Sequence, residues 1–266
     1  MPRYKLVIEY DGTPFCGWQR QTAQPSVQGA IETAVTRFSG ETAGLTCAGR
    51  TDTGVHATHQ VAHLDLAKAW RTDVVRDAVN AHLRPHPVSI LSAEIVAPAF
   101  NARHSAFRRH YRYRILARRS PAALTRGQVW QVPWPLDVGL MQAAARPLLG
   151  CHDFTAFRAA ECQAKSPIRT LEQLDVALQP MGHFEEIVVA ASARSFLHHQ
   201  VRGLVGTLVL AGSGKITADD VADILASRDR SRCGPLAPSC GLTLVGVDYP
   251  GAVESYGDSP RVAESK

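Results

Sequence analysis

The chain has 266 residues and a formal net charge of +5, with 45% hydrophobic and 20% charged residues. This composition is typical of a soluble globular protein and excludes a membrane-spanning chain, because no apolar run approaches the ~20 residues that cross a bilayer. The length suffices for two domains of ordinary size. The start lacks the apolar stretch of a signal peptide, and the six cysteines form no C-x-x-C pair. We therefore expect a cytoplasmic protein with free thiols.

The N-terminal half predicts the order strand, helix, strand, strand, helix, strand. Ser26 caps a helix that has one apolar face and ends at Gly40. Thr72 caps a second helix, which stops before Pro85. Alternating or continuous apolar runs predict strands at residues 5–10, 45–48, 58–66 and 88–95.

The C-terminal half repeats that order less clearly. Asp137 caps a helix ending at Gly150, a long helix covers about 197–210, and a short helix capped by Thr217 is inserted after it. Strands are predicted at residues 111–116, 168–178, 184–191 and 242–247.

These elements indicate an α+β fold made of two similar βαββαβ halves, like ferredoxin or RNA-recognition domains. We expect the halves to join in a mixed, mostly antiparallel sheet, with helices on one side and a basic cleft on the other. The expected N-terminal half is 1–104 and the C-terminal half is 105–250. A tail rich in Ser, Gly, Glu and Pro, 251–266, is expected to be disordered.

The segment 48–57, with the sequence AGRTDTGVHA, lies between two predicted strands. Its glycines permit backbone angles closed to other residues and close approach to the main chain. Asp52 stands two residues from Arg50, so its carboxylate is expected to stay ionised and to point outward. Two interpretations remain at this point: a tight turn with a surface ion pair, or a loop that carries a functional carboxylate.

Positive charge is concentrated between Glu94 and Asp137, a stretch without acidic residues. Its arginines are Arg103, Arg108, Arg109, Arg112, Arg114, Arg118, Arg119 and Arg126. Interleaved Phe107, Tyr111 and Tyr113 add the aromatic surfaces on which bases stack. The pattern favours binding of a nucleic-acid backbone, with a solvated basic face as the alternative.

Arg202 lies next to the apolar face of the long predicted helix, on one stripe with His198 and Gly206. A cation in that place seeks a carboxylate partner, unless its side chain extends to solvent. Gly206 costs about 1 kcal/mol relative to alanine, which suggests close backbone packing.

A metal site on His56, His59 and His63 is a weaker hypothesis. His59 and His63 are four residues apart, about 13 Å on a strand that rises ~3.3 Å per residue, which is too far to share one ion. Phosphate-binding and dinucleotide-binding glycine motifs are absent from the sequence.

Taken together, the motifs resemble the tRNA pseudouridine synthase A family over nearly the whole chain. The motifs that carry this resemblance are Tyr10-Asp11-Gly12, residues 17–21, Ala48–Asp52, Tyr111-Arg112-Tyr113, Asp153-Phe154, Phe157-Arg158, Arg169-Thr170, residues 196–199 with Val201-Arg202, and residues 247–250. Thr53 and Thr243 depart from the residues usual in the family.

The resemblance implies an isomerase that converts uridine to pseudouridine at positions 38, 39 and 40 of the tRNA anticodon arm. It implies that Asp52 is the catalytic nucleophile, with Arg50 and Arg202 as further catalytic residues and Tyr111 against the target base. Whether the carboxylate attacks the base, attacks C1′ or abstracts a sugar proton stays open.

The family also implies a homodimer and no cofactor, metal or membrane. A non-catalytic tRNA-binding protein that uses the same cleft is the alternative.

Overall fold

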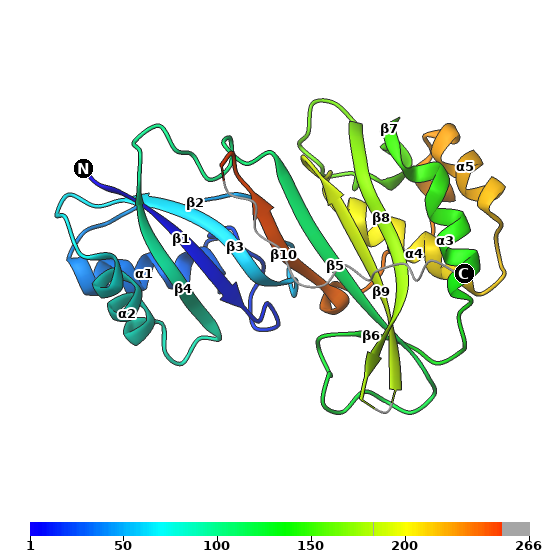
Figure 1. Cartoon of the computed structure of the whole chain (residues 1–266), viewed down its shortest axis with the longest axis horizontal. Helices are drawn as coiled ribbons and strands as arrows, with labels where there is room; N and C mark the ends of the chain where they lie inside the picture. Colours follow the sequence, from blue (N-terminus) through cyan, green and yellow to red (C-terminus); the bar gives the residue numbers. More distant parts are fainter. Residues whose placement is uncertain (183, 252–266) are drawn as a thin grey trace. The chain divides into compact units, whose positions relative to one another are not determined.

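The computed structural model describes residues 1–182 and 184–251, which form two compact units (Figure 1). Among the described residues, the first unit contains Met1–Arg109 and residues 243–251, and the second contains His110–Leu242. The expected division into 1–104 and 105–250 stays a prediction. The expected disordered tail lies outside the described residues, apart from residue 251. Within the described chain, no helix is both long and apolar enough to cross a membrane.

The first six elements of the first unit follow the predicted order, and the unit also includes the strand near residue 242 that the sequence analysis assigned to the C-terminal half. The elements are β1 (Arg3–Tyr10), α1 (Val27–Ser39), β2 (Thr46–Cys47), β3 (His56–Asp65), α2 (Thr72–Leu83), β4 (Val88–Val96) and, from the end of the chain, β10 (Leu242–Asp248). The strands lie in the order β4-β1-β3-β10, with β2 paired to β3. β1 is antiparallel to both β3 and β4, whereas β10 runs parallel to β3.

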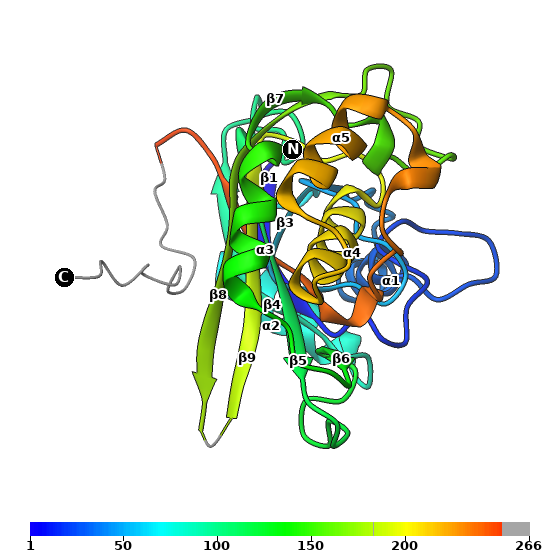
Figure 2. The same cartoon turned by 90° about the vertical axis from the view of Figure 1, so that its right-hand side faces the viewer.

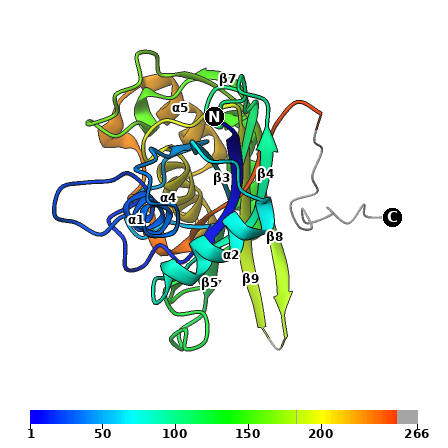
Figure 3. The same cartoon turned by 90° about the vertical axis from the view of Figure 1, so that its left-hand side faces the viewer.

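Alternation along β1 explains the core of this unit, because Tyr4, Leu6 and Ile8 are completely buried. Helix α1 packs against α2, and α2 packs against β4 (Figure 3). The Ser26 cap is confirmed, since its Oγ accepts the Gly29 N–H at 3.2 Å. Gly40 ends the helix in the left-handed conformation at φ 73°.

The predicted Thr72 cap is wrong. Arg71 occupies the cap position with an extended backbone, and Thr72 is the first residue of α2, which has no side-chain cap. The Arg71 guanidinium instead pairs with Asp73 in the first turn at 2.6 Å, where a carboxylate favours a helix N-terminus.

The second unit contains the remaining elements. These are β5 (Arg108–Ala117, whose first two residues belong to the first unit), β6 (Trp130–Val132), α3 (Val138–Ala145), β7 (Gly150–Asp153), β8 (Ile168–Met181), β9 (Phe184–Ala193), α4 (Gln200–Gly212) and α5 (Ala218–Ser227). Short 3-10 turns cover Arg146–Leu148, Thr155–Phe157, Arg230–Arg232 and Ser239–Gly241. The strand order is β5-β9-β8-β7, with β6 beside β5.

Helices α3, α4 and α5 lie on one side of β8 and β9 (Figure 2), and α3 packs against both β8 and α4. The predicted caps at Asp137 and Thr217 are confirmed by bonds to backbone N–H groups. The sequence did not predict the short strands β6 and β7. The pairings of β7 with β8 and of β8 with β9 are antiparallel, so the expected α+β class with mostly antiparallel strands is confirmed.

The long helix begins later than predicted. His199 has a left-handed backbone at φ 64° and stands at the N-cap of α4, so the helix starts at Gln200. Leu197 and His198 therefore precede the helix, and His198 does not share a helical stripe with Arg202.

The connector after β4 is fastened to the first unit by long-range bonds. Arg3 donates to the carbonyl oxygens of Pro98 and Phe100, both at 2.7 Å. Ala102 donates its N–H to Nδ1 of buried His63 at 3.1 Å, and its carbonyl accepts the Tyr249 hydroxyl at 2.6 Å. His63 must be unprotonated at Nδ1 to accept this bond.

We expect the stability of the protein to fall as His63 becomes protonated. Burial, assisted by the charge of Arg3, lowers the pKa of His63 below its ordinary value of 6.5. The unfolded chain then binds more protons than the folded one. The contribution of His63 to the free energy of unfolding is therefore fully present above about pH 6.5, and it declines as the pH drops toward the folded-state pKa. Urea unfolding at several pH values should show a flatter profile for His63→Gln, and an unchanged one for the exposed His82→Gln. A His63→Gln profile as steep as wild type would contradict this assignment.

Candidate active site

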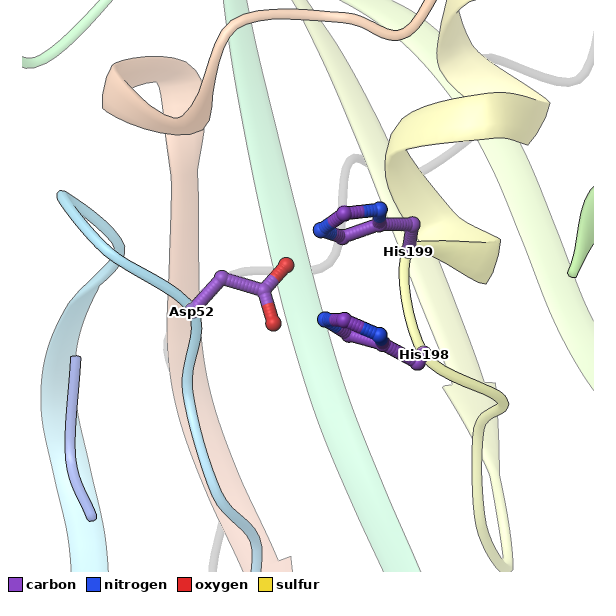
Figure 4. Close-up of side chains that lie close together, drawn as sticks. All are labelled: Asp52, His198 and His199. Carbon is purple, nitrogen blue, oxygen red and sulfur yellow. The ribbon is translucent and has the colours of Figure 1, made fainter. Parts of the chain in front are cut away.

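Asp52 lies on the loop that connects β2 to β3 (Figure 4). The loop is folded back on itself, because the Val55 N–H donates to the Asp52 carbonyl at 3.1 Å. The Thr51 carbonyl accepts the N–H of Trp18 at 3.0 Å. Thr51 is buried, Asp52 is half-buried and Arg50 is exposed. The loop thus holds its carboxylate at the boundary between core and solvent.

Glycines in the loop between β1 and α1 allow this loop to lie directly on the Asp52 backbone. A Cβ at Gly17, which has φ 91°, would stand 2.7 Å from the Thr51 carbonyl oxygen. A Cβ at Gly12 would overlap the carbonyl oxygen of Val55. The two loops therefore meet backbone to backbone, which only glycine permits.

Three buried side chains hold the loop from within the first unit. The Tyr10 hydroxyl and the Thr51 hydroxyl are hydrogen-bonded at 2.8 Å. Gln60 donates from Nε2 to the Gly49 carbonyl at 2.7 Å, and Arg109 donates from Nη2 to the Ala48 carbonyl at 2.8 Å.

The sequence did not indicate that these three side chains hold the loop: Arg109 stood only as a member of the arginine-rich tract, Tyr10 only in a motif of the resemblance, and Gln60 not at all. A signal existed for Gln60, since it is a polar residue two positions from Ala62 and four from Leu64 on the apolar face of a predicted strand.

Beside this loop, Cys47 is a buried thiol. Burial raises its pKa to about 12, while the charge of Arg50 acts in the opposite direction. At neutral pH the thiol is therefore protonated and packs as a small apolar group. All six cysteines are free, as the sequence analysis expects.

Tyr111 lies on β5 in the second unit, with its ring at 5.3 Å from Phe196 in an edge-to-face arrangement. Its neighbour Tyr113 is fully buried and donates its hydroxyl to the Pro238 carbonyl at 2.7 Å. Burial raises the pKa of Tyr113. The expectation that Tyr113 offers a stacking surface is therefore wrong, because its ring belongs to the core.

Arg202 on α4 is half-buried and donates from Nε to the Ala237 carbonyl at 2.8 Å. Ala237 in turn donates its N–H to the Arg202 carbonyl at 3.2 Å. One turn later, a Cβ at Gly206 would overlap the Pro235 carbonyl oxygen. The close packing expected at Gly206 is confirmed, and it fixes the segment that orients the Arg202 guanidinium.

The imidazole rings of His198 and His199 lie side by side ahead of α4, with centroids 3.9 Å apart (Figure 4). The His198 N–H donates to Sγ of Cys162 at 3.4 Å. Burial acts to raise the pKa of Cys162, but backbone N–H donors from Ala164 and His198 and the charge of Arg158 lower it. This thiol thus anchors the turn that begins α4.

The arginine-rich tract divides into structural and exposed members. Arg109 is buried on backbone carbonyls, and Arg114 pairs with buried Glu186 at 2.7 Å. Neither matches the expectation that the tract as a whole contacts phosphates. Arg103, Arg119 and Arg126 are exposed.

The three histidines of the metal hypothesis all lie on strand β3. His56 accepts the Gly12 N–H at Nδ1, and His63 accepts the Ala102 N–H at Nδ1, both at 3.1 Å. His56 also lies 3.1 Å from the Asp11 carboxylate. These rings serve to attach two different loops to the strand.

The predicted site residues occur in two sets. The first unit holds Arg50 and Asp52 on one loop, and the second holds Tyr111 on β5 and Arg202 on α4. Each set is fixed by the contacts of its own unit.

A sequence model described as tRNA pseudouridine synthase matches residues 6–104 and 144–250. The chain belongs to the tRNA pseudouridine synthase family. Arg50, Asp52 and Arg202 lie in the matched segments, and Tyr111 lies between them.

Relatives named tRNA pseudouridine synthase A are similar over nearly their whole length. The relative from Methylorubrum extorquens is 78% identical over 94% of this chain and 100% of its own. The relative from Methylorubrum populi is 76% identical over 94% of this chain and 99% of its own. The one from Azorhizobium caulinodans is 58% identical over 98% of this chain and 100% of its own. The solved structure of an unknown protein from Galdieria sulphuraria aligns with 8% identity over 72% of this chain and 81% of its own, at a TM-score of 0.21.

For this family member, we expect Gly17→Ala to loosen the Asp52 loop. The added Cβ meets the Thr51 carbonyl oxygen, so one loop must move away from the other. Amide hydrogen exchange at Trp18 and Val55 should accelerate, because both N–H groups bond to the Asp52 loop. Gly40→Ala is the matched control, since Gly40 also has a positive φ but opens to empty space. It should cost about 1–2 kcal/mol of stability without affecting those amides. Equal exchange in both variants would contradict the close-packing argument.

Proposed function

We propose that this protein isomerises uridine to pseudouridine in tRNA. The observation that carries the proposal is the Gly49–Asp52 loop, which presents a half-buried carboxylate on a rigid backbone in a chain of this family. The names of the relatives, tRNA pseudouridine synthase A, support tRNA as the substrate. The finer assignment is to uridines 38, 39 and 40 of the anticodon arm, on the resemblance of the motifs.

The reaction rearranges bonds within one nucleotide. The glycosidic bond from C1′ to N1 breaks, the uracil turns in the site, and C1′ bonds to C5. C5 releases its proton and N1 gains one, so the nucleotide is neither oxidised nor reduced. The chemistry therefore requires an acid–base or nucleophilic carboxylate but no redox cofactor. The three routes open to the carboxylate all need an ionised Asp52 within reach of the reacting nucleotide.

A uridine in a stem must leave its stack, which costs a few kcal/mol. Arg50 is exposed beside Asp52, and we assign it to the space that the base leaves. Tyr111 packs against the target base. On the resemblance, we assign Arg202 to pair with the catalytic carboxylate; the bond from its Nε to the Ala237 carbonyl, which orients the guanidinium, supports this role.

The exposed arginines of the tract are assigned to tRNA phosphates. They are Arg103, Arg119 and Arg126. On the resemblance, the enzyme is a homodimer that shares one tRNA across its interface. The free cysteines support a reducing compartment, the cytoplasm.

Asp52→Asn or Asp52→Ala is expected to abolish isomerisation, by about 10⁴-fold or more, because the amide or methyl group offers no nucleophile or base. The assay is tritium release from tRNA labelled at C5 of uridine, which requires the C5–H bond to break. Binding of tRNA by either variant should persist. Asp223→Asn, at an exposed carboxylate on α5, is the matched control and should retain activity.

Tritium release by the Asp52 variants at the wild-type rate would remove Asp52 from its catalytic role. Absence of release by the wild-type protein, with tRNA binding intact, would instead identify a non-catalytic tRNA-binding protein.

Substitutions at Tyr111 separate its two conceivable roles. If the ring packs on the base, Tyr111→Phe should keep most of the activity, whereas Tyr111→Leu should lose roughly 10- to 100-fold, since base stacking contributes about 1–3 kcal/mol. If the hydroxyl relays the C5 proton, both variants should lose activity alike. Single-turnover tritium release measures the difference, and we expect the packing result.

A further inference from the structure

The backbone between β2 and the Asp52 loop changes its hydrogen-bond partners at Ala48. The Ala48 N–H still donates to the Val61 carbonyl of β3 at 2.8 Å, which extends the strand ladder. Beyond that point, the carbonyl groups of Ala48 and Gly49 are satisfied by side chains, those of Arg109 and Gln60. Two consecutive peptide groups directly before Arg50 are thus set by side-chain donors.

Arg109 is 8% exposed and donates to three carbonyl groups. Besides Ala48, it bonds Arg103 at 2.7 Å and Ala106 at 3.0 Å. Those two residues belong to the connector between β4 and β5. A planar guanidinium with several fixed donors can hold the loop and the connector at once, which an ammonium on a flexible stem does poorly.

Gln60 is completely buried. Its Nε2 donates to the Gly49 carbonyl and, at 3.5 Å, to the Tyr10 hydroxyl, which bonds Thr51. Its Oε1 has no hydrogen-bond partner among the described residues. An unsatisfied buried acceptor is costly, but the same amide supplies the donor that satisfies the Gly49 carbonyl. The side chain therefore accepts one unfavourable burial while it holds the loop backbone.

We propose that Arg109 and Gln60 are positioning residues for the isomerisation. By fixing the peptide groups of Ala48 and Gly49, they set the direction in which Arg50 and Asp52 leave the strand. Arg109 thereby differs in role from the exposed arginines of the same tract. This inference rests on the proposed function, because its readout is catalysis.

The test compares Arg109→Lys, Arg109→Gln and Gln60→Met. Methionine has a similar length. It removes the unsatisfied acceptor but leaves the Gly49 carbonyl without its donor, and because these two effects oppose each other, the thermal midpoint of Gln60→Met should stay within about 4 °C of wild type. All three variants should show single-turnover rates at least about tenfold lower, with KM and tRNA affinity changed less than about twofold. Arg109→Lys should have a higher single-turnover rate than Arg109→Gln, although lower than that of wild type.

Salt dependence separates positioning from phosphate binding. The slope of log affinity against log salt should be unchanged in Arg109→Gln, and should decrease by about one in Arg126→Gln. Arg37→Gln removes a charge at an exposed position on α1, outside the Asp52 loop and the arginine-rich tract. It should alter neither the single-turnover rate nor the slope of log affinity against log salt.

A double variant tests whether the two residues serve one segment. Gln60→Met combined with Arg109→Lys should be scarcely slower than the slower single variant, because either loss already frees the same backbone. Fully multiplicative losses would overturn this shared role. Folded single variants with wild-type rates, or a raised KM with an unchanged single-turnover rate, would overturn the proposal. A wild-type protein without tritium release would instead defeat the proposed function.

Discussion

Backbone-to-backbone contact between two loops is the constraint on which the Asp52 site depends. The loop after β1 lies on the loop after β2 at a separation that leaves no room for a Cβ at Gly12 or Gly17. Because the contact involves main-chain atoms, it cannot adjust by rotamer changes, and any displacement moves the peptide that carries Asp52. This contact explains why a short, polar segment at the protein surface can hold a carboxylate in one orientation.

The second unit applies the same principle to Arg202. Gly206 meets the Pro235 carbonyl, and the chain that follows supplies Ala237 as acceptor for the Arg202 guanidinium. At the other end of this region, the left-handed backbone of His199 begins α4 abruptly. Rigid main-chain packing therefore supports charged side chains in both units, and the hydrogen bonds made by those side chains refine their orientation.

Periodicity and capping residues predicted most helices and strands, because these signals are local. The sequence also marked Asp52 and Arg50, since glycines beside a carboxylate are conspicuous. It did not indicate that Arg109 is buried, because the sequence of the arginine-rich tract does not show which arginines lie on the buried face of β5. The strand register decides this. Likewise, the late start of α4 depends on the backbone angle at His199, which apolar periodicity does not encode. Gln60 is 11 residues from Gly49 in the sequence, and its amide reaches the Gly49 carbonyl only because β2 pairs with β3 in the folded sheet.

The parallel pairing of β10 with β3 has a consequence for biosynthesis. β10 joins Thr243 and Leu244 to His56 and Ala57, the residues that directly follow the Asp52 loop, and Tyr249 then fastens the connector at Ala102. During translation, this edge of β3 cannot pair with β10 until residues 243 and 244 have left the ribosome, by which time the intervening unit has emerged. The strand that directly follows the Asp52 loop consequently gains its β10 neighbour late, and a chain that ends before Thr243 leaves this edge of β3 without it.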